Sequence, residues 1–241
     1  MSGTNRLLGI VLNKINYLEN DQIIDFYTLE KGKVEILVRG GRKINSKLAP
    51  IIAEPFTLLV LTVADGKNYF HLIGGEKKQR FLGILKRKSQ SFKLHSLFKK
   101  INQLIKSEPD KKVFSLIIRF LEVIDQSPEI KFLALNNAFL IKFLSFLGYR
   151  PEIRKCLICQ KEIRALKMFF NFRKGGTICL CHPFDKDFEK TEAMIIDQTL
   201  LNILQKLLYQ NFNFIIKDSF QETDLKKTGN LIKKFFIWHL N

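Results

Sequence analysis

The first eighty residues alternate between short apolar stretches and polar turn signals, as β-structure does. Five segments are rich in the β-branched and aromatic residues that favour strands: they are Leu7–Ile15, Gln22–Leu29, Val34–Arg39, Phe56–Val63 and Asn68–Ile73. Clusters such as Glu30–Lys33 and Ala64–Lys67 separate them. Because closure removes unpaired strand edges, five short strands in so small a unit predict a closed barrel.

Beyond residue 80 the apolar period becomes helical. Much of one apolar stripe is given by Leu82, Leu85, Phe92, Leu97, Ile101, Leu104 and Ile105. Ser107–Pro109 and Ser127–Glu129 have the composition of helix starts, and Gly148 that of a helix end. Two further helices are expected at about Asp197–Tyr209 and Glu222–Leu240.

These patterns predict an α+β chain of two parts. Residues 1–80 are expected to form a barrel, best matched by the five-stranded oligonucleotide-binding (OB) type. Residues 81–241 are expected to form a helical domain that carries an inserted metal-binding segment at about 153–184.

All four cysteines lie in that segment, as Cys156, Cys159, Cys179 and Cys181, and His182 follows the last. A Cys-x-x-Cys turn directs two thiolates at one ion, and Gly175-Gly176 suits a sharp turn that brings the second group back. Tetrahedral zinc takes four ligands, so either Cys181 or His182 completes the set. We therefore expect one structural Zn²⁺; the alternatives are free thiols or two disulfides, and disulfides persist mainly in oxidising compartments. A catalytic zinc keeps an open position and a nearby base, and Glu162 is the only acid between the two halves of the segment.

The formal net charge of +17 favours a polyanionic partner. An A/T-biased genome also enriches lysine, but it does not explain why residues 77–107 contain no acid while cations such as Lys86, Arg87 and Lys88 accumulate. We interpret this tract as an anion-binding face; the alternative is a solvated helix surface.

A glycine-containing basic loop joins two of the predicted strands. Its glycines permit close backbone approach to a ligand, and we expect its side chains to contact phosphates, the alternative being a mobile hairpin with solvated lysines. The side chains concerned are Arg39, Arg42, Lys43, Ser46 and Lys47.

Neither a membrane span nor a signal peptide is expected. The longest apolar run, Phe56–Ala64, is too short to cross a bilayer, and residues 1–6 lack the apolar core of an export signal. We expect a cytoplasmic protein.

The order of these features resembles the bacterial recombination mediator family RecO. In the first half the resemblance rests on Arg39-Gly40-Gly41-Arg42-Lys43 with Ser46, and on Pro55-Phe56. In the second half it rests on Leu147-Gly148-Tyr149-x-Pro151, Cys156-x-x-Cys159 and Gly175-Gly176-x-x-Cys179. The family usually ends its metal motif with a second Cys-x-x-Cys, whereas here His182 stands at the last position and Cys181 one residue earlier.

The resemblance implies a nonenzymatic, nucleoid-associated protein that binds single- and double-stranded DNA and anneals complementary strands. It also implies work with RecR, and sometimes RecF, in loading RecA onto DNA coated by single-strand-binding protein. Tyr17 and Tyr69 are candidates for base stacking, and burial in the barrel is the alternative for both. Two other functions stand beside this one: an adaptor that binds the acidic C-terminal tail of single-strand-binding protein without DNA, and a zinc-dependent hydrolase or nuclease.

Overall fold

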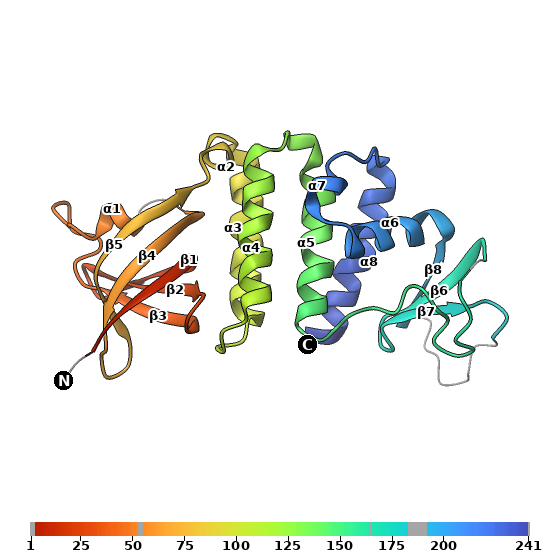
Figure 1. The fold of residues 1–241 in the computed structure, drawn as a ribbon, viewed down its shortest axis with the longest axis horizontal. Helices are drawn as coiled ribbons and strands as arrows, with labels where there is room; N and C mark the ends of the chain where they lie inside the picture. The colour runs from red at the N-terminus through yellow and green to blue at the C-terminus, as the bar shows by residue number, and fades with distance from the viewer. Residues whose placement is uncertain (1–2, 53–54, 164, 183–191, 241) are drawn as a thin grey trace. The chain divides into compact units, whose positions relative to one another are not determined.

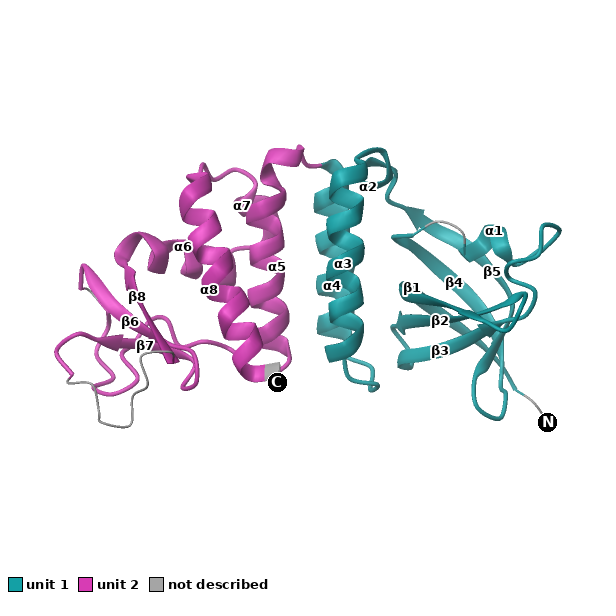
Figure 2. Cartoon of the chain, turned by 180° about the vertical axis from the view of Figure 1, so that it is seen from behind, with its two compact units in different colours: residues 1–126 teal, residues 127–241 magenta. Residues whose placement is uncertain are grey.

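The computed structural model describes residues 3–52, 55–163, 165–182 and 192–240 (Figure 1). The chain divides into two compact units, unit 1 (residues 1–126) and unit 2 (residues 127–241), which are coloured separately in Figure 2. Residue 80, where strands give way to helices, lies inside unit 1.

Unit 1 begins with the predicted five strands, and they close into a barrel in the order β1-β2-β3-β5-β4 (Figure 1). The neighbours are antiparallel except β3 and β5, which pair in parallel. This five-stranded closure is OB-like and confirms the predicted fold class. The strands are β1 (Thr4–Tyr17), β2 (Asp21–Thr28), β3 (Gly32–Val38), β4 (Thr57–Ala64) and β5 (Phe70–Arg80).

The barrel interior is filled by alternate side chains of all five strands. Leu7, Phe26, Ile36, Leu59 and Leu72 belong to one buried apolar cluster. A register shift between Val11 and Asn13 bends β1, as a bulge does where a sheet closes on itself. The outward positions of the strands are therefore those available to a ligand.

Helices complete unit 1: α2 (Leu82–Lys86), α3 (Lys88–Leu104) and α4 (Lys111–Gln126), besides the short α1 (Ala49–Ile52) between β3 and β4. Helix α4 begins later than Ser107–Pro109 predicts, because the Asp110 carboxylate accepts hydrogen bonds from the backbone N–H groups of Lys112 and Val113 (2.7 and 3.3 Å). The preceding turn contacts the barrel, since the Lys33 N–H donates to the Ser107 carbonyl (3.2 Å). Helix α3 also packs on β1.

The described residues of unit 2 form a short 3-10 helix, η1 (Glu129–Lys131), and the α-helices α5 (Phe132–Phe146), α6 (Gln198–Tyr209), α7 (Phe212–Ile215) and α8 (Glu222–Leu240). Helices α5, α6 and α8 pack on one another. Helix α5 ends at Phe146, and Gly148 follows its C-cap residue, Leu147, close to the predicted stop. With φ +101°, Gly148 lets the Tyr149 N–H return to the Leu144 carbonyl (2.9 Å).

A small sheet, which the sequence patterns did not predict, lies between α5 and α6 in the chain. Its order is β7-β6-β8, from β6 (Lys167–Asn171), β7 (Gly176–Cys179) and β8 (Ala193–Asp197). Strand β7 carries the second half of the cysteine motif. Among the described residues, no helix has the length and apolarity that a bilayer crossing requires.

Candidate metal centre and basic barrel surface

Four side chains of the cysteine segment converge in unit 2. The ligand atoms of Cys156, Cys159, Cys179 and His182 all lie within 4.8 Å of one another. Cys156 is buried and the other three are partly buried. The Nε2 atom of His182 is buried and has no hydrogen-bond partner among the described residues. This atom is therefore available as a metal ligand. This group can hold one metal ion with tetrahedral preference.

The first knuckle is a tight backbone turn around Cys156. The Cys156 N–H donates to the Lys161 carbonyl (2.8 Å), and the Cys156 carbonyl accepts from the Gln160 N–H (3.0 Å). Gln160 has φ +60°, a left-handed conformation that costs a residue other than glycine free energy. The Ile158 N–H points at the Cys156 sulfur (3.4 Å). The turn is therefore already shaped for a thiolate at position 156.

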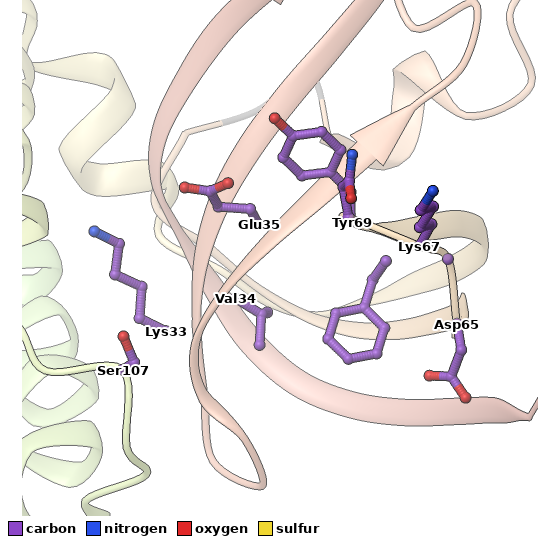
Figure 3. Close-up of a pocket in the computed structure, with 10 residues that line it drawn as sticks. Lys33, Val34, Glu35, Asp65, Lys67, Tyr69 and Ser107 are labelled. Atoms are coloured by element: carbon purple, nitrogen blue, oxygen red, sulfur yellow. The ribbon is translucent and has the colours of Figure 1, made fainter.

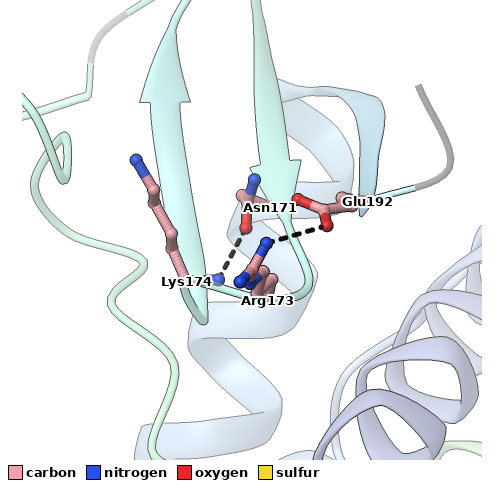
Figure 4. Close-up of polar contacts among 4 residues, drawn as sticks. All are labelled: Asn171, Arg173, Lys174 and Glu192. Atoms are coloured by element: carbon pink, nitrogen blue, oxygen red, sulfur yellow. Dashed lines mark hydrogen bonds and ion pairs between the residues drawn. The ribbon is translucent and has the colours of Figure 1, made fainter. Parts of the chain in front are cut away.

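The second half of the cysteine motif lies at the end of the β6–β7 hairpin. Its turn is fixed by the Asn171 side-chain oxygen, which accepts from the Lys174 N–H (2.6 Å), and by an ion pair of Arg173 with Glu192 (3.3 Å; Figure 4). Gly175, with φ +69°, completes this turn. The Gly175-Gly176 signal in the sequence thus marks the turn that returns β7 toward the knuckle.

Strand β7 is bonded directly to the knuckle. The N–H of the buried Thr177 donates to the Glu152 carbonyl, and the Thr177 carbonyl accepts from the Leu157 N–H (both 2.9 Å). The Cys179 N–H then points at the Cys156 sulfur (3.4 Å). Because these contacts fix both halves of the motif, the convergence of the four ligands follows from the local fold.

The sulfur atoms influence one another's ionisation. Burial raises the pKa of Cys156, but the N–H groups of Cys179, Cys159 and Ile158 outweigh it and the net pKa is lowered. Burial and the neighbouring Cys156 raise the pKa of Cys179. Two thiolates within 4.8 Å of each other repel by about 3.5 kcal/mol or more at an effective dielectric constant of about 20. A cation among the ligands would offset this repulsion, which is the chemistry expected of a metal site.

The remaining cysteine, Cys181, is exposed and stands outside the group that the described side chains form. His182 lies in the turn after β7, where its N–H donates to the Cys179 carbonyl (3.3 Å). Of the two alternatives for the fourth ligand, the structure thus brings His182 to the other three. All four positions are filled by protein side chains and the described group contains no acid, so it lacks the open position of a catalytic site.

The predicted basic loop follows β3 in unit 1. Arg39, Arg42, Lys43 and Lys47 are exposed, and Ser46 is half-buried. The Ser46 hydroxyl accepts from the Ala49 N–H (3.1 Å), so it caps the first turn of α1. The Arg42 guanidinium donates to the Glu19 carbonyl (3.1 Å), which holds the loop against the β1–β2 turn. Arg39, Lys43 and Lys47 are left as the outward cations of the loop.

The other three predicted cations lie where α2 meets α3. Lys86 and Lys88 are exposed. Arg87 is half-buried, and its guanidinium donates to the carbonyls of Ile124 and Asp125 at the end of α4 (2.8 and 3.1 Å). Since these bonds satisfy the last carbonyls of a helix, Arg87 has a structural role that sequence alone did not distinguish from a surface charge.

Two tyrosines distant in sequence meet on the outside of the barrel. The rings of Tyr17, at the end of β1, and Tyr69, before β5, lie edge to face with centroids 6.5 Å apart. Tyr69 also lines a cleft of about 630 Å³ beside the β4–β5 loop (Figure 3). Glu35 and Asp65 line the same cleft together with Lys33 and Lys67, so its charges are mixed. The tyrosine pair is thus partly exposed, as base stacking requires, and is not buried in the core.

Comparison with known proteins matches both halves of the chain. The family model described as "Recombination protein O N terminal" matches residues 1–81, and "Recombination protein O C terminal" matches residues 102–241.

Curated relatives agree with these models. DNA repair protein RecO of Listeria innocua is 30% identical over 186 residues, which cover 74% of this chain and 68% of that protein. The protein of the same name from Caldanaerobacter subterraneus is 23% identical over 236 residues, 96% of this chain and 91% of the relative. That of Rubrobacter xylanophilus is 26% identical over 174 residues, 72% and 69% of the two chains. With both its halves matched, and with the barrel, the helices and the metal-ligand cluster in the expected order, this chain belongs to the RecO family of DNA repair and recombination proteins.

Proposed function

We propose that this protein is a nonenzymatic recombination mediator that binds single- and double-stranded DNA and promotes annealing of complementary strands. Membership of the RecO family carries the proposal, because both halves of the chain match that family. The outward cations of an OB-like barrel add a physical reason. In this role the protein works with RecR, with RecF in some settings, and with the C-terminal tail of single-strand-binding protein, to load RecA.

The DNA surface in this proposal combines the basic loop with the start of α3. Arg39, Lys43, Lys47, Lys86 and Lys88 are exposed cations that can neutralise phosphates without reading sequence. Arg42 and Ser46 would support the loop through their contacts with Glu19 and Ala49. Arg87 is left out of this surface because it caps α4.

The metal in this proposal is zinc with a structural role. Three thiolates and one imidazole are a ligand set typical of structural zinc, and the ion would offset the repulsion among the sulfurs. It would join the Cys156 turn to the end of β7, two segments that are otherwise linked by a few backbone hydrogen bonds. No reaction step is assigned to it.

Annealing follows if one surface neutralises two strands enough for them to approach. The test of DNA binding is the double charge reversal Arg39→Glu/Lys43→Glu, which spares the Arg42 bond to the Glu19 carbonyl. We expect weaker binding of single-stranded DNA and slower annealing. The slope of log affinity against log salt should fall by about 1.4 if two phosphate contacts are lost, at about 0.7 for each.

Lys111→Glu/Lys112→Glu is the matched control. Both lysines are exposed in the first turn of α4, where acids are favoured by the helix dipole, and the change in net charge is the same. If both double variants keep the parent's melting temperature and weaken DNA binding equally, the loop has no special role. If Arg39→Glu/Lys43→Glu binds as tightly as the parent, the proposed surface is wrong.

A further inference from the structure

Phe92 is in an unusual place for a large apolar side chain. The sequence pattern assigns it to the apolar stripe of its helix, yet its side chain in α3 is 77% exposed. The packed face of that helix is formed by other residues, among them Leu94, Leu97, Phe98 and Ile101. Within the described part of the chain, the Phe92 ring makes no aromatic or cation–π contact. Exposing a phenylalanine forgoes burial free energy, so a ligand that covers it is worth seeking.

Cations surround this ring on the same face of α3. Lys88 lies one turn before Phe92, and Lys99 lies two turns after it; His95 is between them, and all three are exposed. At 1.5 Å per residue the two lysines are about 6 and about 10 Å from Phe92 along the helix axis. At 100° per residue all four side chains fall within one narrow stripe. Phe92 is thus the apolar centre of a cationic stripe.

The charge of this stripe is not balanced locally. No aspartate or glutamate occurs from residue 77 to residue 107, so the helix itself offers no partner for these cations. An occupant must therefore combine negative charge with a flat apolar surface. A single-stranded nucleic acid does so, because every unpaired base has a π-face and every neighbouring phosphate a charge. In a duplex the bases are stacked on each other and give Phe92 nothing to contact.

We propose that Phe92 is a stacking site for one unpaired base of single-stranded DNA, with Lys88 and Lys99 on the flanking phosphates. The inference deepens the proposed function, on which it rests, by assigning strand selectivity to α3. The barrel loop binds phosphates of either form of DNA, whereas Phe92 favours the single strand. In annealing, the loss of this contact when bases pair would favour release of the duplex product.

The test compares Phe92→Ala with the parent protein, using a fluorescein-labelled single-stranded oligonucleotide and the corresponding duplex. Base–aromatic stacking predicts single-strand affinity weaker by about fivefold to a hundredfold, with duplex affinity unchanged. The salt slope should stay the same, since no phosphate contact is removed; Lys99→Ala should instead reduce it by about 0.7. Phe214→Ala is the control, because Phe214 is also exposed (57%) but lies in unit 2.

A second measurement reports stacking directly. The chain has one tryptophan, Trp238, so Phe92→Trp in a Trp238→Phe background places a single fluorophore on α3. We expect near-parental single-strand affinity and strong quenching by the single-stranded oligonucleotide, and little by the duplex. Phe92→Leu separates ring stacking from apolar contact, and it should bind as poorly as Phe92→Ala.

Three results would overturn the inference. The first is a Phe92→Ala variant that binds the single strand like the parent, and the second is an equal loss of affinity for single strand and duplex. The third is full single-strand affinity in Phe92→Leu, which would show apolar contact without ring stacking. Failure of the proposed function is distinguishable, since the parent itself would then bind neither oligonucleotide.

Discussion

Removing one metal ligand should destabilise the cysteine segment and leave the barrel intact. The Cys156→Ser variant lacks the buried sulfur that accepts hydrogen bonds from the Ile158 and Cys179 N–H groups. At a metal concentration 1,000 times the dissociation constant, binding stabilises the folded chain by about 4 kcal/mol. For a chain of this size that corresponds to about 8–16 °C in the melting temperature of the transition that includes unit 2.

The assay is metal content by mass spectrometry, together with melting curves and hydrogen exchange. We expect one zinc per parent chain, none in Cys156→Ser, and faster amide exchange in the variant at Gln160 and Cys179. Cys181→Ser is the matched control: Cys181 is outside the ligand group, so metal content and melting should match the parent. The reasoning is refuted if Cys156→Ser keeps its metal and melting temperature, or if Cys181→Ser loses the metal as completely.

Three further predictions concern stability, measured by urea unfolding. Gly32→Ala should lower the free energy of unfolding by about 2 kcal/mol or more. Gly32 has φ +67°, and a Cβ atom there would lie 2.3 Å from the Ser107 carbonyl oxygen. Unfolding at the parental free energy would contradict this. Arg87→Ala should lower the free energy of unfolding by about 1–3 kcal/mol, because the hydrogen bonds to the end of α4 are lost. An unchanged free energy would mean that Arg87 has no structural role. Burial lowers the pKa of Lys142 from 10.5 to about 8, so the folded state releases this proton first as pH rises. The parent should therefore gain stability relative to Lys142→Met between pH 8 and 10.5, by at most about 3 kcal/mol; a flat difference would argue against a buried amine.

The barrel was predictable because alternating apolar residues and turn signals act locally. Two strands are longer than predicted. Strand β1 extends beyond Leu7–Ile15 at both ends, to Thr4–Tyr17. Strand β5 continues through Gly74–Arg80, which is polar and pairs with β4 through tertiary contacts. The three strands of the small sheet escaped prediction for a related reason. Each is short, and the middle strand, β6, is stabilised by partners on both sides that no local pattern reveals.

The candidate site was predictable in its residue types more than in their individual roles. Spacing identified the candidate metal ligands but left both Cys181 and His182 open as the fourth, and the structure brings His182 to the other three. Arg87 and Phe92 show the same limit. A charge that caps a helix and a phenylalanine that faces solvent have the same sequence signature as a surface cation and a core residue.

We propose that this chain is a DNA-binding mediator, and a salt series on the parent protein tests that proposal most directly. Binding of labelled single-stranded DNA is measured with an annealing assay on the same preparation. Contact with three or more phosphates predicts a slope of about −2 or steeper in log affinity against log salt, with faster annealing of complementary strands. Absence of binding at low salt, or a slope near zero without faster annealing, would contradict the account.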